Sequence, residues 1–260
     1  MIKICDLWKR FGKIQVLAGL DLEVNEGETI VILGPSGIGK SVLLKHIIGL
    51  LKPDRGSIDV EGVRITDLEG VELLQALKNM GMLFQGSALF DSMNVEDNVG
   101  FYLKQHGDPE TGKKLSHEEL ESRVKQALEI VGLEGTEKKM PSELSGGMRK
   151  RAALARVIVY RPKIILYDEP TTGLDPIIGM QINELIVKTQ AELKATSIVV
   201  THDMFSALYV GDRLALIRDG KIAQLTDPDN FIKIDDPLIK FLYATISQDP
   251  RKLKEKNHHG

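Results

Sequence analysis

Cysteine is almost absent from this chain, which has one, Cys5, among 260 residues. An internal disulfide is therefore excluded, and the composition suits a reducing compartment. No apolar run approaches the roughly 18 to 20 residues that span a bilayer. The N-terminus also lacks the charged and then apolar segment of a secretory signal. We therefore expect a cytosolic chain that does any membrane work through a partner.

An excess of basic residues is also missing. Lysine and arginine together number 34, against 37 acidic residues, which gives a net charge of −3. A protein that binds nucleic acid usually carries a positive surface to attract the phosphate backbone. The composition therefore gives no electrostatic reason to expect nucleic acid as a partner.

The chain does contain a phosphate loop between a predicted strand and a predicted helix. The segment Gly34-Pro-Ser-Gly-Ile-Gly-Lys40-Ser41 matches G-x-x-x-x-G-K-[ST] and follows the apolar run 30–33. Its glycines let successive N–H groups point at one anion, and the helix adds roughly half a positive charge. The predicted nucleotide-binding residues of this segment are Gly34, Pro35, Ser36, Gly37, Ile38, Gly39, Lys40, Ser41 and Val42.

Two side chains of the loop have specific predicted roles. Lys40 reaches the β- and γ-phosphates as a point charge, and the Ser41 hydroxyl ligates a Mg²⁺ ion that bridges them. The alternative is that the glycines only join a strand to a helix. The complete motif, in its required strand-loop-helix context, favours a nucleoside triphosphate.

Two acidic residues follow a second buried strand, predicted over 164–167. Asp168 is placed to hold the Mg²⁺ shell, and Glu169 to orient and deprotonate the water that attacks the γ-phosphate. Acidic residues also follow strands as helix caps. The complete phosphate loop elsewhere in the chain favours the catalytic interpretation.

Three isolated side chains are further candidates for contact with the nucleotide. Gln85 and His202 follow strands predicted over 82–84 and 197–200, at the sheet edge where α/β folds bind ligands. Gln85 can hold the Mg²⁺ or the water, and His202 can hydrogen-bond the γ-phosphate and sense its loss. Phe11 can stack on a purine. The alternatives are an exposed loop amide, a structural histidine and a partly buried hydrophobe beside a turn.

A second anion site is predicted where Leu144-Ser-Gly-Gly-Met148 opens a helix over 149–160. The alternative is an ordinary helix N-cap by Ser145. One nucleotide needs no second anion site on the same subunit, so this turn predicts two subunits that face each other and share two nucleotides. Four basic residues of the helix are expected to form a solvated face: Arg149, Lys150, Arg151 and Arg156.

The remaining periodicity predicts an α/β core with a helical insertion. Alternating apolar residues indicate strands over 1–24, and an edge strand is expected over 57–60. Helical periodicity replaces the strand signals beyond Gly86, where Ser116 and Glu119 have the spacing of a capping box. The predicted boundaries are 1–235 for the domain, about 86–161 for its helical subdomain, and 236–260 for a C-terminal tail with a short helix.

Four features follow one another along the chain: the phosphate loop, Leu144-Ser-Gly-Gly147, Asp168-Glu169 and His202. Together they resemble the nucleotide-binding subunit of an ABC transporter, and the resemblance covers nearly the whole chain. The resemblance implies a P-loop NTPase fold with a mainly parallel core sheet and antiparallel β segments. It also implies a homodimer that hydrolyses ATP with Mg²⁺. Met148 departs from the glutamine usual in the family. The resemblance to the ABC family also implies roles for further residues. Phe11 would stack on adenine, and Gln85 would be the glutamine of the Q-loop. Ser145, Gly146 and Gly147 would bind the nucleotide of the other subunit, and Asp175 would link the two active sites.

A second resemblance is narrower. Residues 84–99, Met148 and residues 236–242 are similar to the ATPase of Mla or Mce-type lipid transport systems. This implies phospholipid transport between bacterial membranes, by a peripheral subunit on the cytoplasmic side of the inner membrane. The implied partners are a permease, an Mce-type lipid-binding protein and a small regulatory protein. The permease would dock on residues 88–93, whose apolar side chains can also fill the subdomain core.

Three other functions remain open from the sequence. The first is an ATPase of an amino-acid or methionine importer. The second is an ABC protein that acts on nucleic acid or ribosomes, although this chain has one cassette and no sustained heptads. The third is an ATP-gated module without turnover, which the presence of both Glu169 and His202 disfavours.

Overall fold

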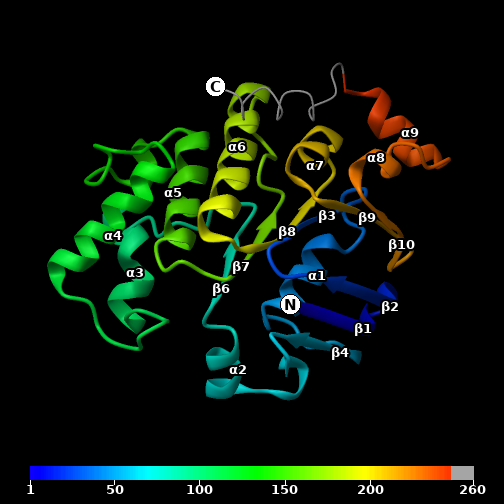
Figure 1. Cartoon of the computed structure of the whole chain (residues 1–260), viewed down its shortest axis with the longest axis horizontal. Helices are drawn as coiled ribbons and strands as arrows, with labels where there is room; N and C mark the ends of the chain where they lie inside the picture. The colour runs from blue at the N-terminus through cyan, green and yellow to red at the C-terminus, as the bar shows by residue number, and fades with distance from the viewer. Residues whose placement is uncertain (247–260) are drawn as a thin grey trace. The chain divides into compact units, whose positions relative to one another are not determined.

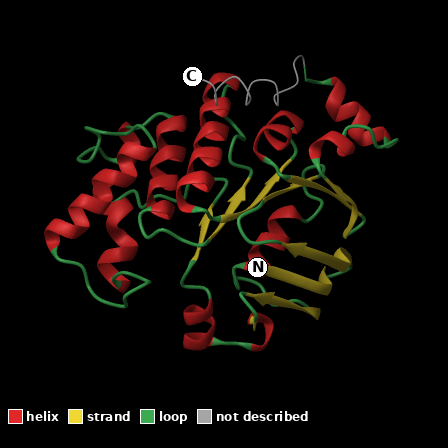
Figure 2. Ribbon diagram, viewed as in Figure 1, coloured by secondary structure: helices red, strands yellow, loops and turns green. Residues whose placement is uncertain are grey.

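Residues 1–246 are described by the computed structural model, and they divide between two units. The first unit combines Met1–Leu77 with the chain from Thr196 onward, and the second unit is Lys78–Ala195. Figure 1 labels the helices and strands of both, and Figure 2 separates helix from strand by colour. The basic end of the tail, 251–256, lies outside the described residues.

The N-terminal part of the first unit forms an antiparallel sheet in the order β2-β1-β4-β5. Alternating apolar residues build it, since Ile4 of β1 pairs with Leu22 of β2 and both are buried. The expected edge position of 57–60 is wrong, because β4 pairs with β1 on one side and with β5 on the other. The strands are β1 (Ile2–Phe11), β2 (Ile14–Val24), β4 (Arg55–Val60) and β5 (Val63–Arg64).

A parallel arrangement surrounds β3 (Thr29–Leu33), whose five residues are all buried. It pairs in parallel with β8 (Thr196–Thr201) and with β9 (Arg213–Arg218). The last strand, β10 (Lys221–Thr226), pairs antiparallel with β9. The predicted parallel core with antiparallel segments is confirmed.

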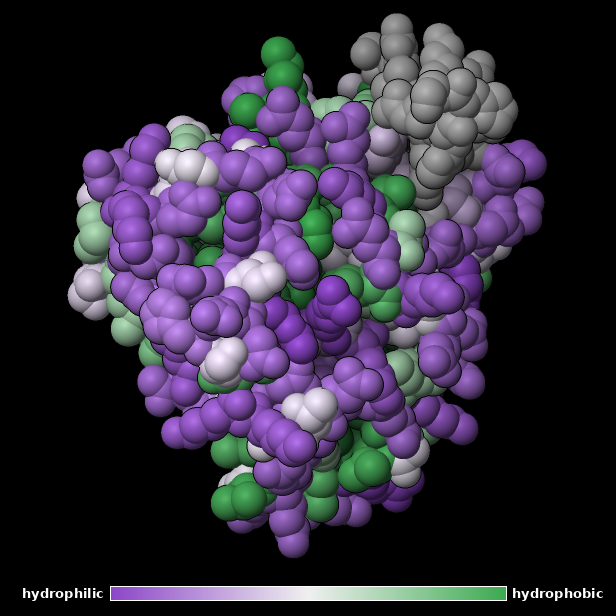
Figure 3. All heavy atoms as spheres, turned by 60° about the vertical axis from the view of Figure 1, so that its left-hand side comes forward, coloured by the Kyte–Doolittle hydropathy of each residue, from purple (hydrophilic) through white to green (hydrophobic). Residues whose placement is uncertain are grey.

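The helices of the first unit differ in how far they are buried. Helix α1 (Lys40–Ile47) buries most of its residues, whereas α2 (Gly70–Ala76) buries none. Val71 and Leu74 of α2 are 73% and 71% exposed, and apolar atoms gather at the lower margin of the surface in Figure 3. The other helical segments are η1 (Ile65–Asp67), α7 (Met204–Val210), α8 (Pro228–Phe231) and α9 (Pro237–Ala244), which corresponds to the short helix predicted in the tail.

The second unit contains the strand pair β6 (Met80–Leu83) and β7 (Ile164–Asp168), which run in parallel. Helical periodicity predicted the region between these strands correctly, including the capping box of Ser116 and Glu119. The green helices α3, α4 and α5 pack against one another (Figure 1). The helical segments are α3 (Val95–His106), α4 (His117–Ile130), η2 (Pro141–Glu143), α5 (Gly146–Ile158) and α6 (Pro176–Leu193).

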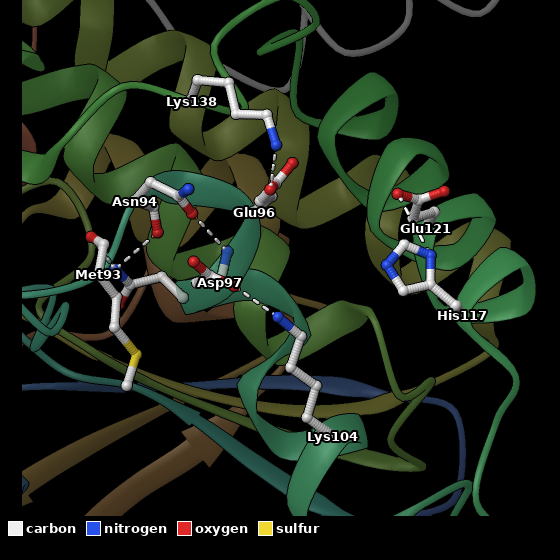
Figure 4. A network of polar contacts seen from close by, with 9 residues as sticks. Met93, Asn94, Glu96, Asp97, Lys104, His117, Glu121 and Lys138 are labelled. Atoms are coloured by element: carbon white, nitrogen blue, oxygen red, sulfur yellow. Dashed lines mark hydrogen bonds and ion pairs between the residues drawn. The ribbon is translucent and has the colours of Figure 1, made fainter.

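A polar network fixes the start of α3 (Figure 4). Asn94 caps the helix by accepting from the Asp97 N–H at 2.8 Å. Ion pairs of 2.5 Å join Glu96 to Lys138 and Asp97 to Lys104. The first turn of α3 is therefore held both by its cap, Asn94, and by the loop that contains Lys138.

None of the helices in residues 1–246 is both long and apolar enough to cross a bilayer.

Candidate functional site

The phosphate loop lies between β3 and α1, as predicted. Lys40, the first residue of α1, is 4% exposed. Its ammonium donates to the carbonyl oxygens of Gly34 at 2.7 Å and Pro35 at 3.0 Å. The cation is thus held inside the loop, next to the backbone that is expected to surround a phosphate.

The loop leaves no room for side chains at two of its glycines. A Cβ at Gly34 would lie 2.7 Å from Ile217 Cγ2, and one at Gly39 would lie 2.7 Å from Val16 Cγ1. Gly39 also has φ +112°, and Gly37 has φ +81°, a region that favours glycine. A tight glycine cradle with a buried lysine is chemically suited to a polyphosphate.

His202 follows β8 and Gly34 follows β3. Leu33 and Thr201, the last residues of these strands, are register partners in the parallel pair. The phosphate loop and His202 therefore emerge side by side at one sheet edge. His202 is exposed, and the backbone behind it is fixed by Asp203, whose N–H donates to Thr201 Oγ1 at 3.0 Å.

Phe11 lies at the tip of the β1–β2 hairpin and is 45% exposed. The Lys9 ammonium is 5.7 Å from the centre of its ring. An exposed ring is available for stacking, so this position is compatible with the predicted contact to a base.

In the second unit, Gln85 and the acidic pair leave neighbouring strands. Leu83 of β6 and Tyr167 of β7 are register partners, so the chain after each reaches the same edge. Asp168 and Glu169 are 5% and 6% exposed, whereas Gln85 is exposed. The register thus brings the segments that carry Gln85, Asp168 and Glu169 to one edge of this strand pair, while their roles remain predictions.

Glu169 is held in an unusual backbone conformation. Its φ is +47°, in the left-handed region that side chains seldom adopt. Thr172 Oγ1 donates to Glu169 Oε2 at 3.0 Å. The carboxylate is thus positioned from two directions, by the backbone turn and by the hydroxyl.

The donors present are compatible with Mg²⁺. This ion binds one or two carboxylates and keeps water and phosphate oxygens as its other ligands. The described residues contain no group of three or more His, Cys, Asp or Glu side chains that could hold a metal. A hydroxyl at Ser41, a carboxylate at Asp168 and an amide at Gln85 are the oxygen donors that this ion prefers.

Ser145 directly precedes α5 and accepts from the Met148 N–H at 3.3 Å, so the N-cap interpretation is correct for its side chain. The same turn is exposed at Ser145 and Gly146. A Cβ at Gly147 would lie 2.5 Å from Ile178 Cγ2 of α6. The Ser145 turn therefore packs directly on the first turn of α6.

Asp175 caps that helix. Its carboxylate accepts from the Ile177 N–H at 3.0 Å and the Ile178 N–H at 3.1 Å. Asp175 therefore caps the same first turn of α6 on which the Ser145 turn packs. Its role in communication between the active sites remains a prediction.

The expected solvated basic face of α5 is wrong for Lys150, which is 4% exposed. Its ammonium donates to Gln85 O at 2.5 Å. Arg151 and Arg156 are half-buried and also donate to backbone carbonyl oxygens. Their partners lie in distant segments, which the charge pattern of α5 alone does not reveal.

Comparison with known proteins gives the family of the chain. The sequence pattern of the ABC transporter family matches residues 17–172, which include the phosphate loop, the Ser145 turn and the acidic pair. The chain belongs to the ABC transporter family. The predicted enzyme class, an ATPase that uses ATP and Mg²⁺, is thereby confirmed.

Several members of the ABC family are similar over almost the whole chain. The probable ribonucleotide transport ATP-binding protein of Mycobacterium leprae is 42% identical over 92% of this chain and 67% of its own length. The chloroplastic protein trigalactosyldiacylglycerol 3 of Arabidopsis thaliana is 37% identical over 96% of this chain and 74% of its own. The chain spans 65 to 67% of the length of the mycobacterial relatives.

Solved ABC cassettes share the fold. A dimeric ATP-binding cassette in a post-hydrolysis state with ADP and Pi is 32% identical, with a TM-score of 0.78 over 88% of this chain and 99% of that chain. A subunit of an ABC transporter complex from Clostridium perfringens is 29% identical, with a TM-score of 0.79 over 97% of this chain and 98% of that chain. The predicted ABC ATPase fold is confirmed.

Proposed function

We propose that this ABC cassette pairs with a second copy around two ATP molecules and drives a membrane permease that moves phospholipid. The observation that carries the hydrolytic part is Glu169, a buried carboxylate fixed by its left-handed backbone and by Thr172. A carboxylate held in this way is suited to accept a proton from an attacking water.

The roles of the residues follow from their chemistry. Lys40 and the loop N–H groups bind the phosphates, while Ser41 and Asp168 hold the metal. When bound, Mg²⁺ supplies positive charge that neutralises phosphate oxygens. Gln85 orients the water, a carboxylate oxygen of Glu169 takes its proton, and His202 hydrogen-bonds the terminal phosphate.

Glu169→Gln tests this assignment. We expect the variant to bind ATP with nearly the affinity of the native chain, and its turnover to fall by about 100-fold or more, because an amide cannot accept the proton. Glu184→Gln is the matched control, since Glu184 is exposed on α6 of the same unit. Near-native turnover by Glu169→Gln would overturn the mechanism.

The dimer part of the proposal rests on Ser145, Gly146 and Gly147. This turn carries exposed positions at the start of a helix of 13 residues and therefore offers N–H groups to an anion supplied from outside the subunit. Glu169→Gln should form a dimer when ATP is added, measured by light scattering. Ser145→Arg in that background should abolish the dimer, because it places bulk and positive charge in the turn. A dimer that persists in the double variant would exclude the proposed contact.

The permease is proposed to dock on residues 88–93. Phe90 is 40% exposed and contacts the Phe101 ring at 4.8 Å between centroids, so it serves both the surface and the subdomain core. Asn98 secures this backbone by exchanging hydrogen bonds with Phe90, at 2.8 Å and 3.0 Å. A fixed segment with a partly exposed aromatic ring is suited to bind a partner helix.

The phospholipid cargo rests on the resemblance of residues 84–99, Met148 and residues 236–242 to lipid-transport ATPases. The test is purification of Glu169→Gln from native membranes in mild detergent with ATP, followed by mass spectrometry of the bound proteins and lipids. Recovery of a permease together with an Mce-type protein would support the proposal. The same mass spectrometry also tests for a small regulatory subunit. The proposed location of the chain is peripheral, at the cytoplasmic side of the inner membrane.

The same purification separates the alternative functions. The methionine import ATP-binding protein of Clostridium tetani is 39% identical over 93% of this chain. An amino-acid permease would therefore keep the ATPase mechanism and overturn the lipid cargo. Ribosomes, or no membrane protein at all, would overturn the transporter proposal.

A further inference from the structure

Lys150 connects the start of α5 to the turn that carries Gln85. Its ammonium donates to Gln85 O at 2.5 Å and reaches Phe84 O at 3.5 Å. Phe84 and Gln85 directly follow β6, so Lys150 grips the chain where it leaves the strand. The side chain is 4% exposed, and these contacts are therefore shielded from water.

The charge of Lys150 faces the acidic pair after β7. Burial lowers the pKa of Lys150, while the negative charges of Asp168 and Glu169 oppose that shift. A buried cation is costly unless anions and hydrogen-bond acceptors surround it. Lys150 has both, since its ammonium donates to the backbone of the Gln85 turn and is influenced by the charges of the two carboxylates.

The same helix holds the next part of the turn through Arg156. Its guanidinium donates to Ala88 O at 2.7 Å and Ser87 O at 3.2 Å. Ser87 and Ala88 have φ of +65° and +50°, unusual values for residues with side chains. The turn is therefore held in a strained form by contacts from α5, and Lys150 makes the contact nearest to Gln85.

We propose that Lys150 is a positioning residue for ATP hydrolysis, which fixes the backbone of Gln85 relative to Asp168 and Glu169. This inference rests on the proposed roles of those three residues. It assigns Lys150 no contact with the nucleotide. Its loss should therefore reduce turnover while leaving nucleotide affinity nearly unchanged.

The first experiment needs no nucleotide. Hydrogen–deuterium exchange of the native chain is compared with Lys150→Met, which retains the length of the side chain without its charge. We expect exchange of amides 85–90 to become about tenfold faster in the variant, because the turn loses its nearest anchor. Arg151→Met is the matched control, since Arg151 donates to Val131 O at 3.3 Å and Gly132 O at 3.0 Å instead. Its effect should be confined to that loop.

The second experiment measures turnover with Mg²⁺ and ATP, together with the affinity for ATP. Lys150→Met should lose about 10- to 100-fold in kcat, as expected for misplaced catalytic groups, and change the Kd for ATP by less than about threefold. Arg151→Met should retain native turnover. If Lys150→Met does not fold, Lys150→Leu, which also lacks a donor for Gln85 O, is used for both experiments with the same expected outcomes.

A double-mutant cycle with Gln85→Ala tests whether Lys150 acts on turnover through Gln85. If Lys150 acts by positioning Gln85, adding Lys150→Met to Gln85→Ala should cost less than about twofold in kcat, because the group it positions is already absent. Losses that multiply would overturn the inference, as would unchanged exchange of amides 85–90. An inactive native chain would instead overturn the proposed hydrolysis itself.

Discussion

Leu33 of β3 and Thr201 of β8 are paired in parallel register, and each is the last residue of its strand. The residues that follow them are Gly34, which begins the phosphate loop, and His202. A single strand pairing thus brings two distant parts of the sequence to one edge. The position of His202 is set by the sheet, while its exposed imidazole remains accessible.

This pairing predicts the effect of His202→Ala. We expect kcat to fall by about 100-fold, because a hydrogen bond to the terminal phosphate is lost where charge develops, and ATP affinity to change little. The measurement is steady-state turnover alongside equilibrium nucleotide binding. His117→Ala is the control, since His117 is exposed on α4 and pairs only with Glu121 in the described contacts. Equal turnover of the two variants would contradict the role of His202.

Gly39 gives a prediction about stability. Gly39→Ala should lower the free energy of unfolding by about 2 to 4 kcal/mol, because the new Cβ meets Val16 and the backbone is left-handed. Gly12→Ala is the control, with φ +56° and nothing within 4 Å of the added atom. It should cost about 1 kcal/mol from backbone strain alone. Denaturant unfolding measures both, and equal losses would show that contact with Val16 is unimportant.

His46 predicts how stability depends on pH. It is 1% exposed on α1, and its pKa lies below the usual 6.5 chiefly because burial disfavours the charged form. The unfolded chain then binds the proton more readily than the folded chain. Stability is therefore fully present above about pH 6.5 and is lost as pH falls from there through the lowered folded pKa.

The measurement is the free energy of unfolding between about pH 4.5 and 7.5. His46→Gln should weaken the pH dependence in this range, whereas His106→Gln, which removes an exposed histidine, should leave it nearly as in the native chain. If the free energy of unfolding of His46→Gln changed with pH as steeply as that of the native chain, the pH dependence would arise from other groups.

Arg156 predicts a difference between basal and permease-coupled turnover. Its guanidinium is 5.6 Å from the centre of the Phe90 ring and also binds the carbonyls of Ser87 and Ala88. Arg156→Met should reduce stimulation by the reconstituted permease by about tenfold, because the docking segment loses its support. Basal turnover should fall less. Arg151→Met serves as the control, and equal losses of basal and stimulated turnover in Arg156→Met would argue against docking on this segment.

Local patterns sufficed to predict the strands and the segments that follow them. The phosphate loop is a contiguous motif, and the apolar runs before Asp168 and His202 identify buried strands wherever they occur in the chain. The capping box at Ser116 was equally accessible, because its hydrogen bonds join residues three apart. The roles of the site residues, and the boundaries of the domain and tail, remain predictions.

Contacts between distant residues were not accessible from such patterns. Lys150 lies in a run of basic residues that is typical of a solvated face, yet its acceptor, Gln85 O, is 65 residues away. The expected edge strand at 57–60 failed for a related reason. The neighbour that covers it, β5, has two residues, too few to show an alternating pattern.

Helix α2 has a consequence for the life of the protein in the cell. Its apolar side chains at Val71 and Leu74 face water, and no residue of the helix is buried. An uncovered apolar surface is a site for self-association and for recognition by chaperones and proteases. Any partner or second copy that covers Val71 and Leu74 should therefore slow the removal of this chain, and the supply of that partner would then set how much of the chain accumulates.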